Sequence, residues 1–363
     1  MAARVLCVPA DLGGCGSYRI RWPAEALIAQ GADIRLVLPD DPLEEQIQAM
    51  WIDDGDGVPH VLDVMAPDAD VVVLQRPLQR RLADVIPQLQ AKGVRVVVEV
   101  DDDFDAISPR NVSWPAVQPK LSPGRNRGHL RRACELADWV VVSTPALRER
   151  YGRHGRCTVV PNFVPERYLS IEREPRDDGS LYVGWTGSVA THPDDLQVTG
   201  GGVARAVRKV SGARVAVVGT GKDVRRNLGL NEDPLACGWR EIEDYPDAVA
   251  QFDVGIVPLE LTRFNEAKSW LKGLEMAALG VPFVASPTQQ YTALPFGFPA
   301  SNAREWERFT LLLLRDEETR EIFVEEWREA AARFTIEGNC GQWWDAWTAP
   351  LNTRAAVLAH GSN

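Results

Sequence analysis

Short runs of valine, isoleucine and leucine alternate with helix-forming segments along this chain, and this alternation constrains its fold most. The clearest runs in the first half are RVLCVPA (Arg4–Ala10) and VRVVVEV (Val94–Val100). Continuous apolar runs separated by helices are typical of a parallel sheet covered on both faces. The sequence therefore predicts an α/β fold. Further strands are expected at 33–38, 71–74, 139–143 and 158–160, with helices at 17–30, 79–90 and 130–137.

The same alternation begins again after a charged segment that contains proline. Residues 165–180 (PERYLSIEREPRDDGS) have no regular apolar period and are typical of a domain linker. Strands are then expected at 181–185, 214–218, 254–258 and 282–285, with helices at 194–208, 266–279 and 303–333. A chain of 363 residues is long enough for two domains. We expect Rossmann-like domains over 1–165 and 166–335, followed by a tail over 336–363.

The tail carries tryptophans at a helical spacing. Trp343 and Trp347 are four residues apart, so a helix places both on one face. We expect this face to dock on one of the two domains, which allows the tail to cross back to the N-terminal domain.

Composition excludes several classes of protein. The chain is 45% hydrophobic and 25% charged, as in ordinary soluble proteins, and no apolar run approaches the roughly 18 residues of a membrane helix. The net charge of -11 gives no support to non-specific nucleic-acid binding. No C-x-x-C or H-x-x-x-H pair is present, so we expect free thiols, no zinc site and a cytoplasmic protein. No signal peptide is recognised at the N-terminus. The six cysteines are Cys7, Cys15, Cys134, Cys157, Cys237 and Cys340.

The strongest chemical signal is the segment FNEAKSWLKGLEMAALGVPFVAS (264–286). We predict a helix with Asn265 as its N-cap and Lys268 in its first turn, so that Lys268, Lys272 and Glu275 share one face. A cation at this end of a helix is unfavourable by roughly a few tenths of a kcal/mol. The placement is explained if an anion such as phosphate binds there. The plain alternative is a solvated face with a Lys272–Glu275 pair.

At this point the sequence resembles a known family. Glu275 to Ser286 (EMAALGVPFVAS) resembles the C-terminal half of GT-B glycosyltransferases, especially the family 4-like group. In that family the glutamate contacts the donor ribose, while basic residues and the helix N-terminus hold the diphosphate. The resemblance therefore implies a donor site with Glu275, Lys268, Lys272, Asn265 and Ser269. Many members have a second glutamate eight positions earlier, and this chain has Ala267 there.

Other segments of the second half agree with this resemblance. The stretch W-x-G-S-x-x-x-H-x-x-D (185–195) resembles the family's donor-side loop, which implies phosphate contacts from Gly187, Ser188 and His192. The plain alternative is a strand-to-helix turn with Asp194 or Asp195 in the first helical turn. By the same resemblance, Lys222 of VVGTGK reaches phosphate and the nucleobase lies near Trp239. VVGTGK is not a P-loop.

A glycine-rich turn follows the first strand. The order GGCGSYR (13–19) places Arg19 where the dinucleotide fingerprint has its third glycine. The resemblance implies that Gly14 and Gly16 meet the donor phosphate, with Tyr18 and Arg19 pointing near it. The alternative is a nicotinamide site, in which Asp40 or Asp41 binds ribose.

Four aspartates follow the strand at 94–100: Asp101, Asp102, Asp103 and Asp105. The carboxyl ends of parallel strands are where open α/β sheets place their sites. Asp102 and Asp103 are the candidates to orient acceptor hydroxyls, to act as a base or to bind a divalent cation. A solvated acidic loop is the plain alternative. The D-x-D pattern also occurs in GT-A transferases, but that fold does not predict a second Rossmann-like half.

The resemblance implies transfer of a sugar from a nucleoside diphosphate sugar to an acceptor hydroxyl, with retention of configuration. Lys268 and Lys272 would stabilise the leaving diphosphate, so no metal ion is expected. An inverting reaction would need a base, for which Asp102 or Asp103 are the candidates. The alternatives are a sugar-nucleotide 2-epimerase, a non-catalytic sugar-nucleotide-binding protein and a nicotinamide-dependent enzyme. The sequence leaves the acceptor open among a polysaccharide, a lipid, a protein and a modified DNA base.

Overall fold

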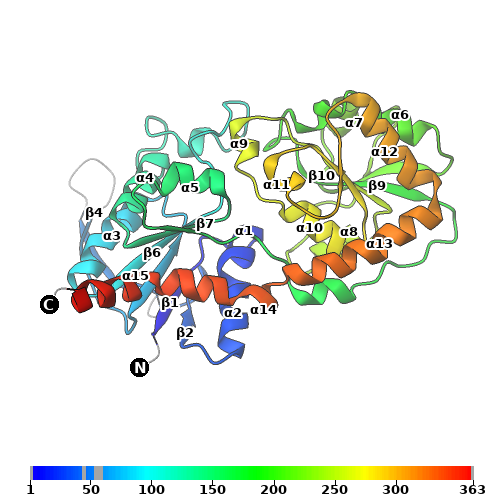
Figure 1. The fold of residues 1–363 in the computed structure, drawn as a ribbon. Coiled ribbons are helices and arrows are strands. Elements are labelled where there is room, and N and C mark those ends of the chain that lie inside the picture. The colour runs from blue at the N-terminus through cyan, green and yellow to red at the C-terminus, as the bar shows by residue number, and fades with distance from the viewer. Residues whose placement is uncertain (1–2, 43–45, 53–59, 361–363) are drawn as a thin grey trace. The chain divides into compact units, whose positions relative to one another are not determined.

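A computed structural model describes residues 3–42, 46–52 and 60–360, with no side-chain description after residue 352. The chain divides into two compact units (Figure 1). Unit 1 contains the described residues of 1–107, 113–162 and 336–363, and unit 2 contains 108–112 and 163–335. In the described part of the chain, no helix is long and apolar enough to cross a bilayer.

Unit 1 is built on a six-stranded sheet in the order β2-β1-β5-β6-β7-β8, in which every neighbouring pair is parallel. Val72, Val73, Val97 and Val98 are fully buried, although neighbours in a strand point to opposite faces. The sheet is therefore covered on both sides, as the apolar runs predicted. The strands are β1 (Val5–Val8), β2 (Ile34–Leu36), β5 (Val71–Gln75), β6 (Arg95–Val100), β7 (Trp139–Val142) and β8 (Cys157–Val159).

The helices of unit 1 connect these strands, and α14 and α15 form its C-terminal part. The predicted helix at 17–30 is divided, since its first five residues form a π-helical turn. Such turns are rare and occur mostly as local bulges, frequently at functional sites. The helices are α1 (Gly14–Gly16), the π-turn (Ser17–Arg21), α2 (Trp22–Ala29), α3 (Arg80–Ala91), α4 (Arg127–Leu136), α5 (Pro145–Tyr151), α14 (Ile336–Asn339) and α15 (Gly341–His360), with a 3-10 turn at Pro115–Val117.

Two further features complete unit 1: the C-terminal helix α15 and a hairpin outside the main sheet. Trp343 and Trp347 are fully buried, and α15 packs on β6 and β7. A separate antiparallel hairpin of β3 (Ala49–Ile52) and β4 (His60–Val64) was not predicted. Its side chains lack the apolar-polar alternation that signals a half-buried strand, because Met50, Trp51 and Ile52 are all exposed.

Unit 2 repeats the plan with a six-stranded parallel sheet in the order β11-β10-β9-β12-β13-β14. Its strands are β9 (Leu181–Ser188), β10 (Ala213–Thr220), β11 (Leu235–Ala236), β12 (Val254–Val257), β13 (Phe283–Ala285) and β14 (Phe298–Pro299). Its helices are α6 (Gly202–Arg208), α7 (Val224–Leu228), α8 (Tyr245–Ala250), α9 (Arg263–Glu266), α10 (Leu271–Ala278), α11 (Gln289–Thr292), α12 (Ala303–Arg315) and α13 (Glu317–Ala331), with 3-10 turns at 166–170, 195–199 and 332–334.

The predicted helix at 266–279 is wrong in its first third. Two helices, α9 and α10, are separated by residues 267–270, so Lys268 precedes the longer helix instead of lying in its first turn. Asn265 is not an N-cap, because Thr262 caps α9 through its side-chain oxygen. The amide of Asn265 is engaged with Asp195, and this buried contact outweighs the local capping preference.

Both sheets have a point where the strand order reverses. In unit 1, β1 lies between β2 and β5, and in unit 2, β9 lies between β10 and β12. The loops that leave β1 and β5, or β9 and β12, therefore run to opposite sides of the sheet. The crevice between such loops is where open α/β sheets bind ligands. We call these two places the unit 1 switch point and the unit 2 switch point.

Candidate functional site

The unit 2 switch point is lined by the loops that follow β9 and β12, together with the start of α10. These segments supply six of the polar side chains that the sequence marked: Ser188, His192, Asn265, Lys268, Ser269 and Lys272. Glu275 follows one turn later on α10. The site is thus assembled from residues about 90 positions apart in sequence.

Lys272 is the central cation of this site. Its Nζ donates a hydrogen bond of 2.5 Å to the backbone carbonyl of Thr186, on the last part of β9. The ammonium also lies 6.0 Å from the ring centroid of Trp185. Desolvation and, less strongly, the charge of Lys268 lower the pKa of Lys272 to about 8, against the attraction of Glu275. The charged form of a lysine held in this way becomes more stable when an anion binds next to it.

Gly187 brings the backbone of β9 close to this ammonium. Its φ of 141° lies in the region that L side chains rarely adopt. A Cβ at this position would lie 3.2 Å from both Lys272 Nζ and the ring of Trp185. Because residue 187 is glycine, no side chain occupies the space beside the ammonium, and a ligand phosphate could enter it.

Glu275 is held by a residue that the sequence analysis missed. Its carboxylate is 4% exposed and accepts a hydrogen bond of 3.0 Å from the hydroxyl of Tyr245, the first residue of α8. Burial and the charge of Glu275 raise the pKa of Tyr245, so the phenol keeps its proton and remains a donor. No sequence spacing links residues 30 positions apart, and only the fold joins them.

His192 and Asn265 meet at Asp195, the last residue of the W-x-G-S-x-x-x-H-x-x-D stretch, for which the sequence analysis predicted no such contacts. Asp195 Oδ2 lies 2.7 Å from His192 Nδ1, and Asp195 Oδ1 accepts a hydrogen bond of 2.6 Å from Asn265 Nδ2. Burial alone would raise the pKa of Asp195, but its hydrogen bonds outweigh this and lower it. Burial and the charges of Lys272 and Lys268 lower the pKa of His192. At neutral pH the ring is therefore neutral and the aspartate ionised.

The remaining predicted donor residues of unit 2 lie around this centre. Lys268 rests over the ring of Phe264 at 4.5 Å, and its charge acts on Lys272. Ser188 closes the turn after β9, where its carbonyl accepts the His192 amide at 3.0 Å. Lys222 is exposed after β10, and Trp239 is 76% exposed after β11. An exposed tryptophan beside a glycine of positive φ, Gly238, provides a free aromatic face.

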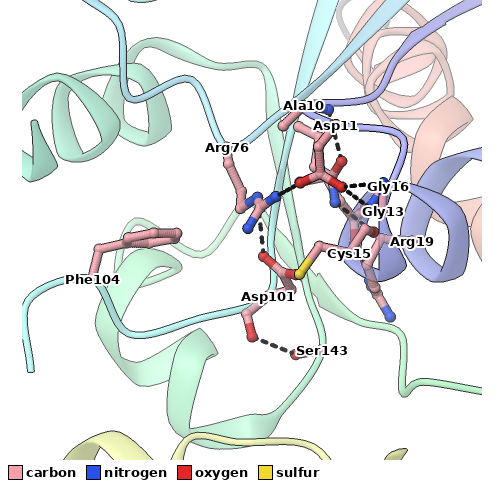
Figure 2. A network of polar contacts seen from close by, with 12 residues as sticks. Ala10, Asp11, Gly13, Cys15, Gly16, Arg19, Arg76, Asp101, Phe104 and Ser143 are labelled. Carbon is pink, nitrogen blue, oxygen red and sulfur yellow. Dashed lines mark hydrogen bonds and ion pairs between the residues drawn. The ribbon is translucent and has the colours of Figure 1, made fainter. Parts of the chain in front are cut away.

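The unit 1 switch point is filled by the chain's own charges (Figure 2). Asp11 Oδ1 accepts hydrogen bonds from the amides of Gly13 and Gly16, at 2.9 and 3.1 Å, and its other oxygen pairs with Arg76. A Cβ on Gly16 would lie 1.8 Å from the Asp11 carbonyl oxygen, which explains the glycine by close packing. In a dinucleotide-binding turn these amides face a pyrophosphate. Here they face a carboxylate, which argues against the nicotinamide alternative and equally against the expected contact of the Gly16 amide with the donor phosphate.

The expectation that Arg19 points towards a donor phosphate is wrong. Its guanidinium is 1% exposed, pairs with Glu99, and donates at 2.7 Å to both Val160 O and Asn162 Oδ1. It also stacks on Trp343 at 5.1 Å. The burial of Glu99 at the end of a central strand demands a cation, and Arg19 supplies it.

The aspartates that follow β6 differ in the residues that they contact. Asp101 lies 3.6 Å from Arg76, and Asp105 pairs with Arg131 at 2.7 Å. Asp103 is 3% exposed, and its Oδ1 accepts the amide of Asp105. Asp102 is the predicted residue that stays partly exposed. Within the described residues, no group of three His, Cys, Asp or Glu side chains is placed to hold a metal ion.

No protein-family model and no curated protein matches this chain. Solved structures do. HepE from Anabaena, in complex with UDP and glucose, matches 96% of this chain and 100% of its own, with a TM-score of 0.59 at 13% identity. A putative UDP-N-acetylglucosamine 2-epimerase from Listeria monocytogenes matches 97% of this chain and 98% of its own, with a TM-score of 0.54 at 12% identity.

The third comparison is with S. aureus TarM, solved with Fondaparinux, alpha-GlcNAc-glycerol and UDP. Its TM-score is 0.54 at 13% identity, and the match covers 76% of this chain but spans only 55% of TarM. Together with the two parallel sheets, these likenesses decide the architecture. The chain has the GT-B fold. At these identities the likeness shows the fold alone, so the chemistry has to come from the side chains.

Proposed function

We propose that this protein is a glycosyltransferase that moves a sugar from a nucleoside diphosphate sugar to an acceptor hydroxyl. The observation that carries the proposal is the cationic unit 2 switch point. Lys272 of α10 donates to the backbone near the end of β9 and has a lowered pKa, and Gly187 leaves room beside it. A desolvated lysine next to bare backbone is suited to an anionic group such as a diphosphate. The similar structures of HepE and TarM hold UDP.

The side chains divide the donor between them. Lys268, Lys272, His192 and the Gly187–Ser188 backbone bind the diphosphate, with Ser269 and Asn265 ordering the turn before α10. Glu275, oriented by Tyr245, accepts the ribose hydroxyls. The exposed ring of Trp239 stacks on the base, and Lys222 lies at the neighbouring strand end.

The chemistry that follows is stabilisation of a leaving group. Charge develops on the diphosphate as its bond to the sugar breaks, and the two lysines offset that charge without a metal ion. In a retaining reaction a diphosphate oxygen takes the proton of the acceptor hydroxyl. Asp102, which is partly exposed and follows β6, is the residue that we propose to orient this hydroxyl. We propose the metal-independent, retaining reaction.

The proposal is tested by the release of nucleoside diphosphate from UDP-, GDP-, ADP- and dTDP-sugars, with binding measured in parallel. Lys268→Ala should weaken binding by about 1.5–3 kcal/mol, the scale for a hydrogen bond to a charged group. Lys209→Ala is the matched control, because this lysine of unit 2 pairs with Glu307.

The products distinguish the rival activities. Conversion of the sugar itself, without transfer, would instead indicate a 2-epimerase. Binding without turnover in the presence of polysaccharide, lipid, protein and hydroxymethylated DNA acceptors would indicate a non-catalytic binding protein. Absence of binding by every nucleotide sugar would contradict the donor site.

A further inference from the structure

Asp195 joins three separate segments of unit 2 through its two carboxylate oxygens. Oδ2 receives His192, from the loop after β9. Oδ1 receives Asn265 Nδ2, from α9, and the backbone amide of Glu260, from the loop after β12, at 2.9 Å. Asp195 is 4% exposed, so these contacts are made away from solvent. It therefore fixes both sides of the unit 2 switch point relative to each other.

These contacts determine which atoms carry hydrogen. An ionised carboxylate only accepts hydrogen bonds, so His192 Nδ1 must carry the proton of the 2.7 Å contact. The neutral ring then presents a lone pair at Nε2. That lone pair repels a phosphate oxygen, whereas a protonated ring donates N–H from the same atom. The side chain is 18% exposed, so the ring is partly open to a ligand.

The charges around His192 have opposing effects on the protonation of its ring. Lys272 and Lys268, near the start of α10, disfavour the protonated ring, and Asp195 favours it. From the 108–112 segment, Arg110 pairs with Asp194 beside the loop. A diphosphate that binds to the two lysines brings negative charge to the same place and reverses the balance.

We propose that Asp195 is a positioning residue that makes donor binding proton-linked: it holds His192 so that the ring takes up one proton from solvent when the diphosphate of the donor binds. Nε2–H then donates to a phosphate oxygen, and the new positive charge is shared with Asp195. No other bond is made or broken. This inference rests on the proposed function, because it assumes that the donor occupies this site.

The test is calorimetry of donor binding at pH 7.0 in buffers of different ionisation enthalpy, which counts protons taken up. The probes are UDP-glucose, GDP-mannose, ADP-glucose and dTDP-glucose, since a nucleotide sugar has no phosphate proton that titrates near neutrality. At this pH Lys272 is already about nine-tenths protonated, because its pKa is about 8. Uptake of more than about half a proton by the wild-type protein is therefore assigned to His192.

Two variants separate positioning from mere structural support. His192→Gln keeps an amide donor but cannot titrate, so uptake should fall below about 0.2 protons. In Asp195→Asn, the donors Asn265 Nδ2 and Glu260 N–H keep the amide oxygen on their side, so the new NH2 faces His192. The ring must then accept at Nδ1 and carry its proton at Nε2. The Asp195→Asn variant should bind the probe without proton uptake. The control is His154→Gln, which replaces a partly buried histidine of unit 1 and should leave the proton uptake unchanged.

The outcomes are separable from those of the proposed function. Binding of a probe with no proton uptake by the wild-type protein overturns the inference and leaves the donor site standing. Uptake that persists unchanged in His192→Gln, or in folded Asp195→Asn, also overturns it. If no probe binds the wild-type protein, the donor site itself is contradicted and the inference fails with it.

Discussion

The two switch points have the same architecture and opposite chemistry. In unit 1, at the crevice between β1 and β5, Asp11 accepts the amides of the glycine turn and pairs with Arg76. In unit 2 the crevice between β9 and β12 carries Lys272, Lys268 and a neutral His192. In unit 1 the charged side chains beside the glycine turn pair with each other, whereas in unit 2 burial disfavours the charged form of Lys272. The comparison teaches that the fold provides a position, while the residues at the strand ends decide whether a ligand is needed there.

The same contrast applies to buried cations. Arg19 of unit 1 is satisfied by Glu99 and by backbone carbonyls, so its charge supports the fold. Lys272 of unit 2 donates to one carbonyl, and its charged form is disfavoured by burial. A charge held against its environment lowers stability and is typical of functional sites.

The largest expected effect is on stability and concerns unit 1. Arg19→Met removes the partner of a fully buried carboxylate, which typically costs about 3–5 kcal/mol of unfolding free energy. Chemical denaturation measures this loss. Donor affinity in the folded fraction should stay unchanged. A shift of less than about 1 kcal/mol would mean that Arg19 does not support the fold.

Lys272→Met should give the reverse pattern. We expect donor affinity to fall by about 10- to 100-fold, since a hydrogen bond to a charged group is removed. The pKa of Lys272 is lowered in the folded state, so its charged form destabilises the fold below pH 8. Thermal unfolding at pH 7 should therefore show an equal or higher Tm. A large fall in Tm with unchanged affinity would break the comparison.

The pH dependence of donor affinity should differ above and below pH 8. As pH rises through about 8, Lys272 of the ligand-free protein loses its proton, and this should add a fall in affinity of up to about tenfold per pH unit to the fall that is linked to His192. Lys272→Arg should remove the part of this fall that begins near pH 8, because arginine does not titrate in this range, and should leave the part that is linked to His192. Calorimetry from pH 7 to pH 9.5 measures both. A flat wild-type profile would contradict the role of Lys272.

The smallest predicted effect concerns the backbone beside Lys272. Gly187→Ala should weaken donor binding by roughly fivefold, because a methyl group would enter the space next to the ammonium. Gly229→Ala is the matched control. Gly229 also has a positive φ, 72°, but nothing lies within 4 Å of a Cβ there. If the two variants lowered donor affinity equally, backbone strain alone would explain the loss of affinity.

Several parts of this structure were readable from sequence. The apolar runs predicted the α/β class, the strands of the unit 1 sheet and four of the six strands of the unit 2 sheet, because buried strands of a parallel sheet need continuous apolar residues. The other two strands, β11 and β14, have only two residues each and were not predicted. The break between α9 and α10 was not readable, because it depends on Asn265 contacting Asp195, 70 residues away. The roles of Asp11, Arg76 and Tyr245 were missed for the same reason. A clue was present for Asp11, since an aspartate two residues before a glycine turn can accept its amides.

The most direct test of the central claim compares one substitution at each switch point. Donor affinity is measured by calorimetry for Lys272→Met and for Asp11→Asn, which keeps the acceptor oxygen for Gly13 and Gly16 but removes the charge. The account predicts that Lys272→Met loses the donor and that Asp11→Asn binds it like the wild-type protein. Loss of binding in Asp11→Asn, with binding retained in Lys272→Met, would place the diphosphate in unit 1 and contradict the account.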